Sequence, residues 1–117
     1  MIATPNQGAL IVDSLKSSGF SGILGPNGKR LHSGEGGLPK TLPLPQVPFI
    51  TIAGTQKNMI GYAPLLSFTG EANDGCIADE DTQLKGESGH YSFAVSHNRI
   101  MHDKRVQSVA LRFILRL

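Results

Sequence analysis

Residues 29–48 of this sequence can form neither a long helix nor the centre of a sheet, because glycine and proline recur throughout them. Three glycines precede four prolines, which are Pro39, Pro43, Pro45 and Pro48. Each proline lacks a backbone donor and disfavours the helical conformation in the residue before it. We therefore predict an extended arm that completes an N-terminal segment, residues 1–48, and leads into a core at residues 49–117.

An extended arm buries little surface within its own subunit and gains stability by lying on a neighbour. The four prolines are therefore our candidates for an assembly contact. This interpretation predicts a homo-oligomer or a larger assembly as the working form of the protein.

The overall composition indicates one folded domain. The 117 residues are 39% hydrophobic with a net charge of +2, whereas disordered chains combine low hydrophobicity with high net charge. Cys76 is the only cysteine, so an internal disulfide is excluded and a reducing compartment is expected. No basic signal region opens the sequence, and no apolar run approaches the roughly 18 residues that span a bilayer. We expect a protein of the cytoplasm or of a virion, without a classical signal peptide and without membrane contact.

Three segments of the core region are read as strands. Residues 49–53 form a short apolar run of β-favouring residues, and residues 90–97 place their larger apolar side chains at alternate positions. Residues 58–69 predict another strand, which Gly61 and Pro64 would confine to an edge or a bulge.

The C-terminal segment, residues 105–117, fits two structures. Its apolar residues alternate without a break from Val109 to Leu117, which favours a strand. A helix also fits, because one stripe would then contain Arg105, Ser108, Arg112 and Arg116. We favour the strand, and therefore a β-hairpin over residues 90–117.

Together these segments predict a mainly β fold. We expect a small antiparallel sheet, barrel or sandwich with a long Gly/Pro-rich N-terminal arm, a C-terminal hairpin and at most one short helix. Residues 9–15 could be a strand or two helical turns, and residues 25–28 read as a turn. The polar and acidic residues 70–89 read as a long loop.

Charge is distributed unevenly along the core region. Six acidic residues lie between positions 71 and 87, and a basic block follows. The cations of that block are our candidates for binding nucleic acid: Arg99, Lys104, Arg105, Arg112 and Arg116. On a two-stranded face, forked arginine donors suit phosphate groups.

No local motif for catalysis, metal binding or a cofactor is present. The glycines near residue 25 lack the spacing of a phosphate-binding loop, and the acidic loop lacks the glycine and glutamate positions of an EF-hand. On a strand, His90 and His97 would face opposite sides, which disfavours zinc. General acid–base chemistry stays open for His97 or His102 with Asp103 or a nearby carboxylate.

These observations rank three functions. The first is a non-enzymatic structural or assembly protein, such as a small viral or phage coat, decoration or connector subunit. The second is a small β-rich module that binds nucleic acid or protein through its basic C-terminal face. The third is a small hydrolase or RNase-like enzyme.

Overall fold

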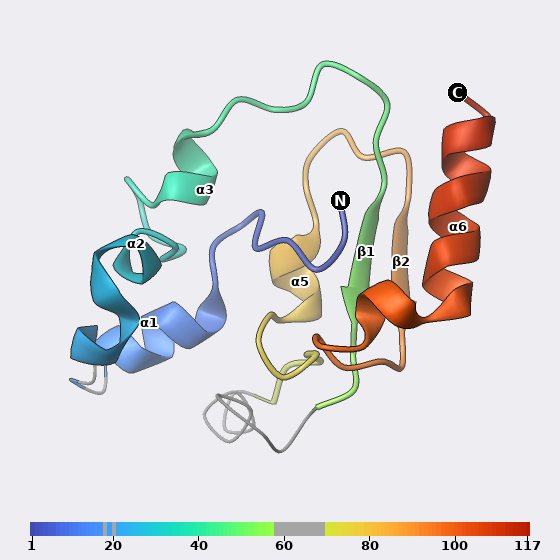
Figure 1. Ribbon diagram of the computed structural model, residues 1–117. Helices are drawn as coiled ribbons and strands as arrows, with labels where there is room; N and C mark the ends of the chain where they lie inside the picture. The colour runs from blue at the N-terminus through green and yellow to red at the C-terminus, as the bar shows by residue number, and fades with distance from the viewer. Residues whose placement is uncertain (18, 20, 58–69) are drawn as a thin grey trace.

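The computed structural model describes residues 1–17, 19, 21–57 and 70–117 (Figure 1). Five α-helical segments and a two-stranded sheet lie within these residues. The elements are α1 (Leu10–Ser17), α2 (Gly25–Lys29), α3 (Leu38–Thr41), β1 (Thr51–Gly54), α5 (Asp79–Thr82), β2 (His90–Phe93) and α6 (Lys104–Leu115), with 3-10 turns at Ser21–Leu24 and Ile100–His102. The prediction of a mainly β fold with at most one short helix is therefore wrong.

The sheet is parallel, which also contradicts the predicted antiparallel sheet, barrel or sandwich. Thr51 of β1 lies opposite His90 of β2, and Gly54 lies opposite Phe93. The start of the chain adds a third parallel segment on the other side of β1, where Ile2 pairs with Ile52. The backbone N–H of Ala3 donates to the Ile52 carbonyl at 2.8 Å, and the Ile52 N–H donates to the Met1 carbonyl at 3.0 Å.

The burial of β1 explains why the sequence could not reveal its partner. All four residues of β1 are buried, so the strand is covered on both faces and lacks the alternating pattern that would indicate which side faces a partner. The predicted strand at 49–53 is confirmed in β1, and that at 90–97 is confirmed only for β2. The predicted strand at 58–69 lies outside the described residues.

The C-terminal segment forms helix α6, so the predicted hairpin over residues 90–117 does not exist. Asp103 caps the helix by accepting from the backbone N–H of Arg105 at 2.8 Å and of Val106 at 3.4 Å. Val106 is buried in the core, and Val109 and Phe113 pack against it with helical spacing. The misleading alternation came from Leu111 and Leu115, which are apolar but exposed.

Two hydrophobic clusters hold the structure together. The larger contains Ile50, Ile52, Val95 and Ile100 and connects β1 with α6. The smaller surrounds α1, the helix that forms where the sequence had left strand or helix open. Figure 1 shows α1, α2 and α3 grouped on one side of the sheet and α6 on the other. The turn predicted at residues 25–28 is part of α2.

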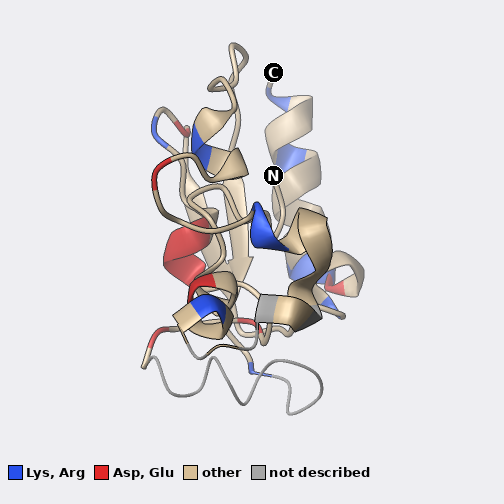
Figure 2. Cartoon of the chain, turned by 90° about the vertical axis from the view of Figure 1, so that its left-hand side faces the viewer, with Lys and Arg blue, Asp and Glu red and all other residues tan. Residues whose placement is uncertain are grey.

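The acidic segment is only partly a loop, because α5 lies within it. Figure 2 shows α5 as a concentration of acidic residues. Several of these acids serve the fold. The Asp81 carboxylate accepts from the backbone N–H of Leu10 at 2.8 Å, where α1 begins, and burial raises its pKa. The side chain of Asn6 donates to the Thr82 carbonyl at 2.6 Å, so α5 links the N-terminal segment to the core.

Gly54 ends β1 at a point where three parts of the chain meet. A Cβ atom on Gly54 would lie 2.4 Å from the Val95 carbonyl oxygen and 2.7 Å from Cβ of Asp74. Neither contact can be relieved by rotating a flexible side chain. Glycine at this position therefore permits the loop after β2 and the loop that carries Asp74 to approach β1.

We expect Gly54→Ala to lower the free energy of unfolding by about 1–3 kcal/mol, because the added methyl group overpacks a backbone contact. Gly22→Ala is the matched control, since a Cβ atom there would meet nothing within 4 Å. Urea denaturation of both variants measures the difference. Equal stability of the two variants would contradict the close approach at Gly54.

Candidate active site

The carboxyl ends of β1 and β2 lie at the same edge of the sheet, because the strands are parallel. The loops that follow stay paired: Thr55 N–H donates to the Phe93 carbonyl at 2.9 Å, and Gln56 N–H donates to the Val95 carbonyl at 3.2 Å. Open parallel sheets commonly bind their ligands at this edge. The side chains presented there are therefore the first place to look for chemistry.

A buried carboxylate and a half-exposed imidazole meet at this edge. The Asp74 side chain is 1% exposed, and its Oδ2 lies 2.8 Å from Nδ1 of His97, whose side chain is 37% exposed. Asp74 is itself held in place, because its Oδ1 accepts from the backbone N–H of Cys76 at 2.9 Å and of Ile77 at 2.8 Å. The backbone N–H of His97 donates to the Asp74 carbonyl at 2.9 Å, so the two residues are joined twice.

This contact defines the chemical state of the His97 ring. A carboxylate that accepts at Nδ1 keeps the proton on Nδ1 and leaves Nε2 with a free lone pair. The hydrogen bond to Asp74 raises the pKa of His97 above its ordinary value of 6.5, although burial of the ring opposes the shift. An imidazole oriented in this way can accept a proton at Nε2, and the nearby carboxylate stabilises the resulting cation.

A polar pocket of about 380 Å³ lies on the same two loops. Gln56 and Lys57 line it from the chain after β1, and Ser96 and Arg99 line it from the chain after β2. Arg99 was a sequence candidate for nucleic-acid binding, and the structure places it here, two residues beyond His97. The pocket combines hydrogen-bonding groups with two positive charges.

A second histidine, His90, also contacts an aspartate but is arranged differently. Its Nδ1 lies 2.7 Å from Oγ1 of Thr51, which also contacts Glu87, and its Nε2 lies 3.3 Å from Oδ2 of Asp79. Both ring nitrogens are thus engaged within the protein. The network joins β1, β2 and α5, and we assign it to the fold rather than to chemistry.

Within the described residues, no group of three or more acidic, histidine or cysteine side chains could hold a metal ion.

The other basic candidates lie together on α6, away from Arg99 in the chain. They are Lys104, Arg105 and Arg112 of the helix, together with Arg116, which caps its C-terminal end. Arg105 is paired with Asp103, whose pKa falls to about 2 because of that pair, and its guanidinium lies 5.6 Å from the centre of the Phe93 ring. The predicted two-stranded basic face is therefore replaced by the exposed side of a helix. Nucleic-acid binding by these residues stays a prediction.

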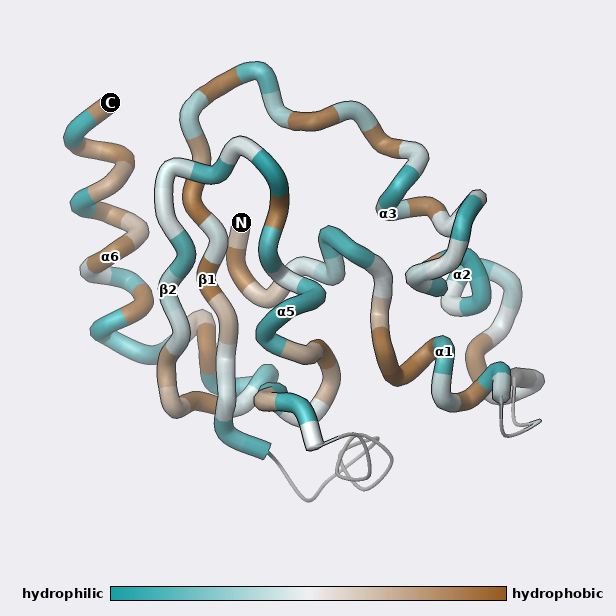
Figure 3. Tube along the Cα trace, turned by 180° about the vertical axis from the view of Figure 1, so that it is seen from behind, coloured by the Kyte–Doolittle hydropathy of each residue, from teal (hydrophilic) through white to brown (hydrophobic). Residues whose placement is uncertain are grey.

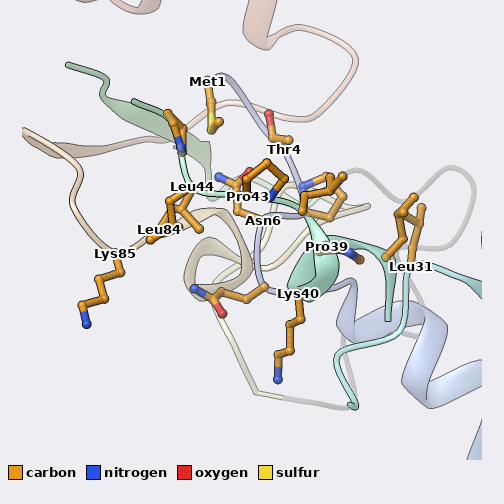
Figure 4. Close-up of a pocket in the computed structure, with 15 residues that line it drawn as sticks. Met1, Thr4, Asn6, Leu31, Pro39, Lys40, Pro43, Leu44, Leu84 and Lys85 are labelled. Atoms are coloured by element: carbon orange, nitrogen blue, oxygen red, sulfur yellow. The ribbon is translucent and has the colours of Figure 1, made fainter. Parts of the chain in front are cut away.

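The arm does not remain fully extended. Pro39 lies in the first turn of α3, where proline is tolerated, and the extended chain resumes after Thr41. Pro39, Pro43 and Pro45 line a mainly apolar cavity of about 590 Å³, shown in Figure 4, while Pro48 follows outside it. This cavity shares no lining residue with the pocket beside His97. An assembly contact through the four prolines stays a prediction.

Sequence reasoning named His97 as an acid–base candidate but missed its partner. It offered Asp103 or an unspecified nearby carboxylate, and the structure uses Asp103 to cap α6. Asp74 was counted only as one member of an acidic loop. Its pairing with His97 spans 23 positions, and a single sequence contains no local signal for such a contact.

Comparison with known proteins gave no matching family model and no significantly similar curated protein or solved structure. A search of the described residues for a helix of sufficient length and apolar character to cross a membrane found none.

The Asp74–His97 contact predicts a pH-dependent stability. A histidine whose pKa is raised by folding stabilises the protein below the ordinary value of 6.5, and this contribution is lost as the pH rises through the folded-state pKa. We expect Asp74→Asn to lower the pKa of His97, as measured by NMR titration of the ring protons, and to flatten the stability profile in that range. His102, which lies in the turn Ile100–His102, is the internal reference. An unchanged His97 pKa in the variant would contradict the contact.

Proposed function

We propose that the protein is a hydrolase in which His97 is the general base and Asp74 is the residue that orients it. The observation that carries this proposal is the 2.8 Å contact between a buried carboxylate and Nδ1 of a ring that is still 37% exposed. A purely structural ion pair would not require an accessible ring, whereas a base must reach its substrate.

The expected reaction is the cleavage of an ester-type bond. His97 Nε2 accepts the proton of a hydroxyl nucleophile while the nucleophile's oxygen bonds to the carbonyl carbon. When the tetrahedral intermediate collapses, the bond to the leaving group breaks and Nε2–H returns the proton to the departing oxygen. Asp74 keeps the ring in the required tautomer and stabilises the imidazolium between the two transfers.

The placement of the pair supports this class. Hydrolases built on parallel α/β sheets carry an acidic residue and then a histidine in chain order, after the nucleophile, and they use the carboxyl edge of the sheet. Asp74 and His97 follow that order and lie at that edge. The shared arrangement is an analogy, and the 2.8 Å contact between Asp74 and His97 is the physical support for the proposal. Among the described residues, Asp74 is the group that hydrogen-bonds to the His97 ring. In this proposal the nucleophile is a water molecule or a hydroxyl group presented to Nε2.

We expect His97→Ala and Asp74→Asn to lower the rate of hydrolysis of a neutral ester, 4-nitrophenyl butyrate, by roughly 10²–10⁴-fold. Absorbance of the released nitrophenolate measures the rate. The wild-type rate should rise with pH through the His97 pKa, because only the neutral ring is a base. An initial burst of nitrophenolate would identify a side-chain hydroxyl as the nucleophile, and its absence would favour water.

The matched control is His102→Ala, which removes a histidine that takes no part in the pair. Circular dichroism establishes whether each variant folds. Hydrolysis by wild-type protein that all three variants retain equally would refute the assignment of His97.

Self-association is a second candidate property, and one observation favours it. Leu111, Ile114 and Leu115 of α6 are 57%, 62% and 76% exposed and lie three and four residues apart, so they form one apolar stripe. Figure 3 shows the apolar residues at this end of α6. A second copy of the same stripe is a suitable partner, in agreement with the homo-oligomer expected from the sequence.

We expect light scattering to show a dimer or larger form, which the double variant Leu111→Ser and Leu115→Ser converts to a monomer. The two serines remove the exposed apolar surface that would stabilise the contact between the α6 helices of two copies. Met101→Ser is the control, because Met101 is 59% exposed but lies outside α6. A wild-type monomer would remove this candidate.

A further inference from the structure

The polar pocket is lined by Ser96, the residue before His97, although His97 itself is not among its lining residues. Lys57 and Arg99 supply two positive charges to its lining, and Gln56 and Ser96 supply hydrogen-bonding groups. None of the described residues that line it is acidic. Within the described part of the chain, neither cation takes part in an ion pair. Two like charges that share a pocket repel each other, and a bound anion would relieve that repulsion.

Ser96 contributes a hydroxyl group to the pocket. The residue is only 7% exposed although it lines the cavity, and no hydrogen bond of its hydroxyl to another described residue is present. Among the described residues no buried side-chain oxygen lacks a partner, so the Ser96 Oγ is open to the pocket and can donate a hydrogen bond to a group that enters it. A carboxylate accepts hydrogen bonds from hydroxyl, amide and guanidinium donors together.

We propose that this pocket binds a carboxylate on the substrate, so that the His97 site hydrolyses esters of dicarboxylic acids in preference to neutral esters. This inference rests on the proposed hydrolase function and names its substrate class. The anchored carboxylate would fix the position of an ester carbonyl elsewhere in the same molecule.

The local backbone supports joint action of the pocket and the base. Ser96 and His97 are consecutive, and the backbone N–H of Arg99 donates to the Ser96 carbonyl at 3.0 Å, which closes a tight turn around His97. The hydrogen bond from Gln56 N–H to the Val95 carbonyl ties the Lys57 side of the pocket to that turn. A substrate held at both points would lose little freedom on reaching the transition state.

The cations on α6 make a different ligand, an extended nucleic acid, less suitable for this pocket. Lys104, Arg112 and Arg116 do not line it. A volume of about 380 Å³ fits a small anionic group, whereas a nucleic-acid backbone requires a row of cations along a surface.

The test compares two esters of equal acyl length, the monoanionic 4-nitrophenyl hydrogen succinate and the neutral 4-nitrophenyl butyrate. We expect the wild type to prefer the succinate ester. Arg99→Gln and Lys57→Gln should each raise KM for the succinate ester about three- to ten-fold more than they change KM for the butyrate ester. Arg112→Gln is the matched control, because it removes a positive charge outside the pocket.

Equilibrium binding of succinate, measured by titration calorimetry at fixed ionic strength, separates this inference from the proposed function. Succinate binding that is lost in both pocket variants would support the anion pocket even if hydrolysis proved independent of His97. Hydrolysis that requires His97 but shows no charge preference, together with no succinate binding, would refute the pocket and retain the hydrolase. The inference would also be overturned if the pocket variants lost turnover of the succinate ester and of the butyrate ester to the same extent.

Discussion

The parallel hydrogen bonding of β1 with β2 determines where every element of the candidate site lies. Because both strands end at the same edge, residues that follow them in the chain become neighbours there. The connection between the strands is long, so it can cross over and bring Asp74 to that edge as well. An antiparallel hairpin would instead have placed the end of one strand beside the start of the other.

Close approach at Gly54 is the second requirement. The loop that carries Asp74 and the loop after β2 both contact β1 at this residue, and no side chain would fit between them. Asp74 is then buried with its carboxylate satisfied by two backbone donors and by His97. A buried charge is costly unless its hydrogen-bonding capacity is met, and these contacts meet it. The fold thus provides a fixed carboxylate before any ligand is present.

The sequence could predict the position of β1, because residues 49–53 are short, rich in β-favouring side chains and preceded by a proline-rich segment. It could not predict α6 correctly, since Leu111 and Leu115 are apolar residues on an exposed surface and imitate the period of a strand. It could not pair Asp74 with His97 either. That contact depends on the direction of the strands and on the path of the crossover, and neither is encoded in residues near the two side chains.

The two histidines beside aspartates show why contact alone does not identify a base. His90 touches Asp79, yet Thr51 occupies its other ring nitrogen, so the ring links parts of the fold and has no free lone pair to offer. His97 is bound on one side only by the described residues, and its exposed fraction is large. Each histidine ring has one nitrogen beside an aspartate. The two rings differ at the second nitrogen, which contacts Thr51 in His90 and has no described partner in His97.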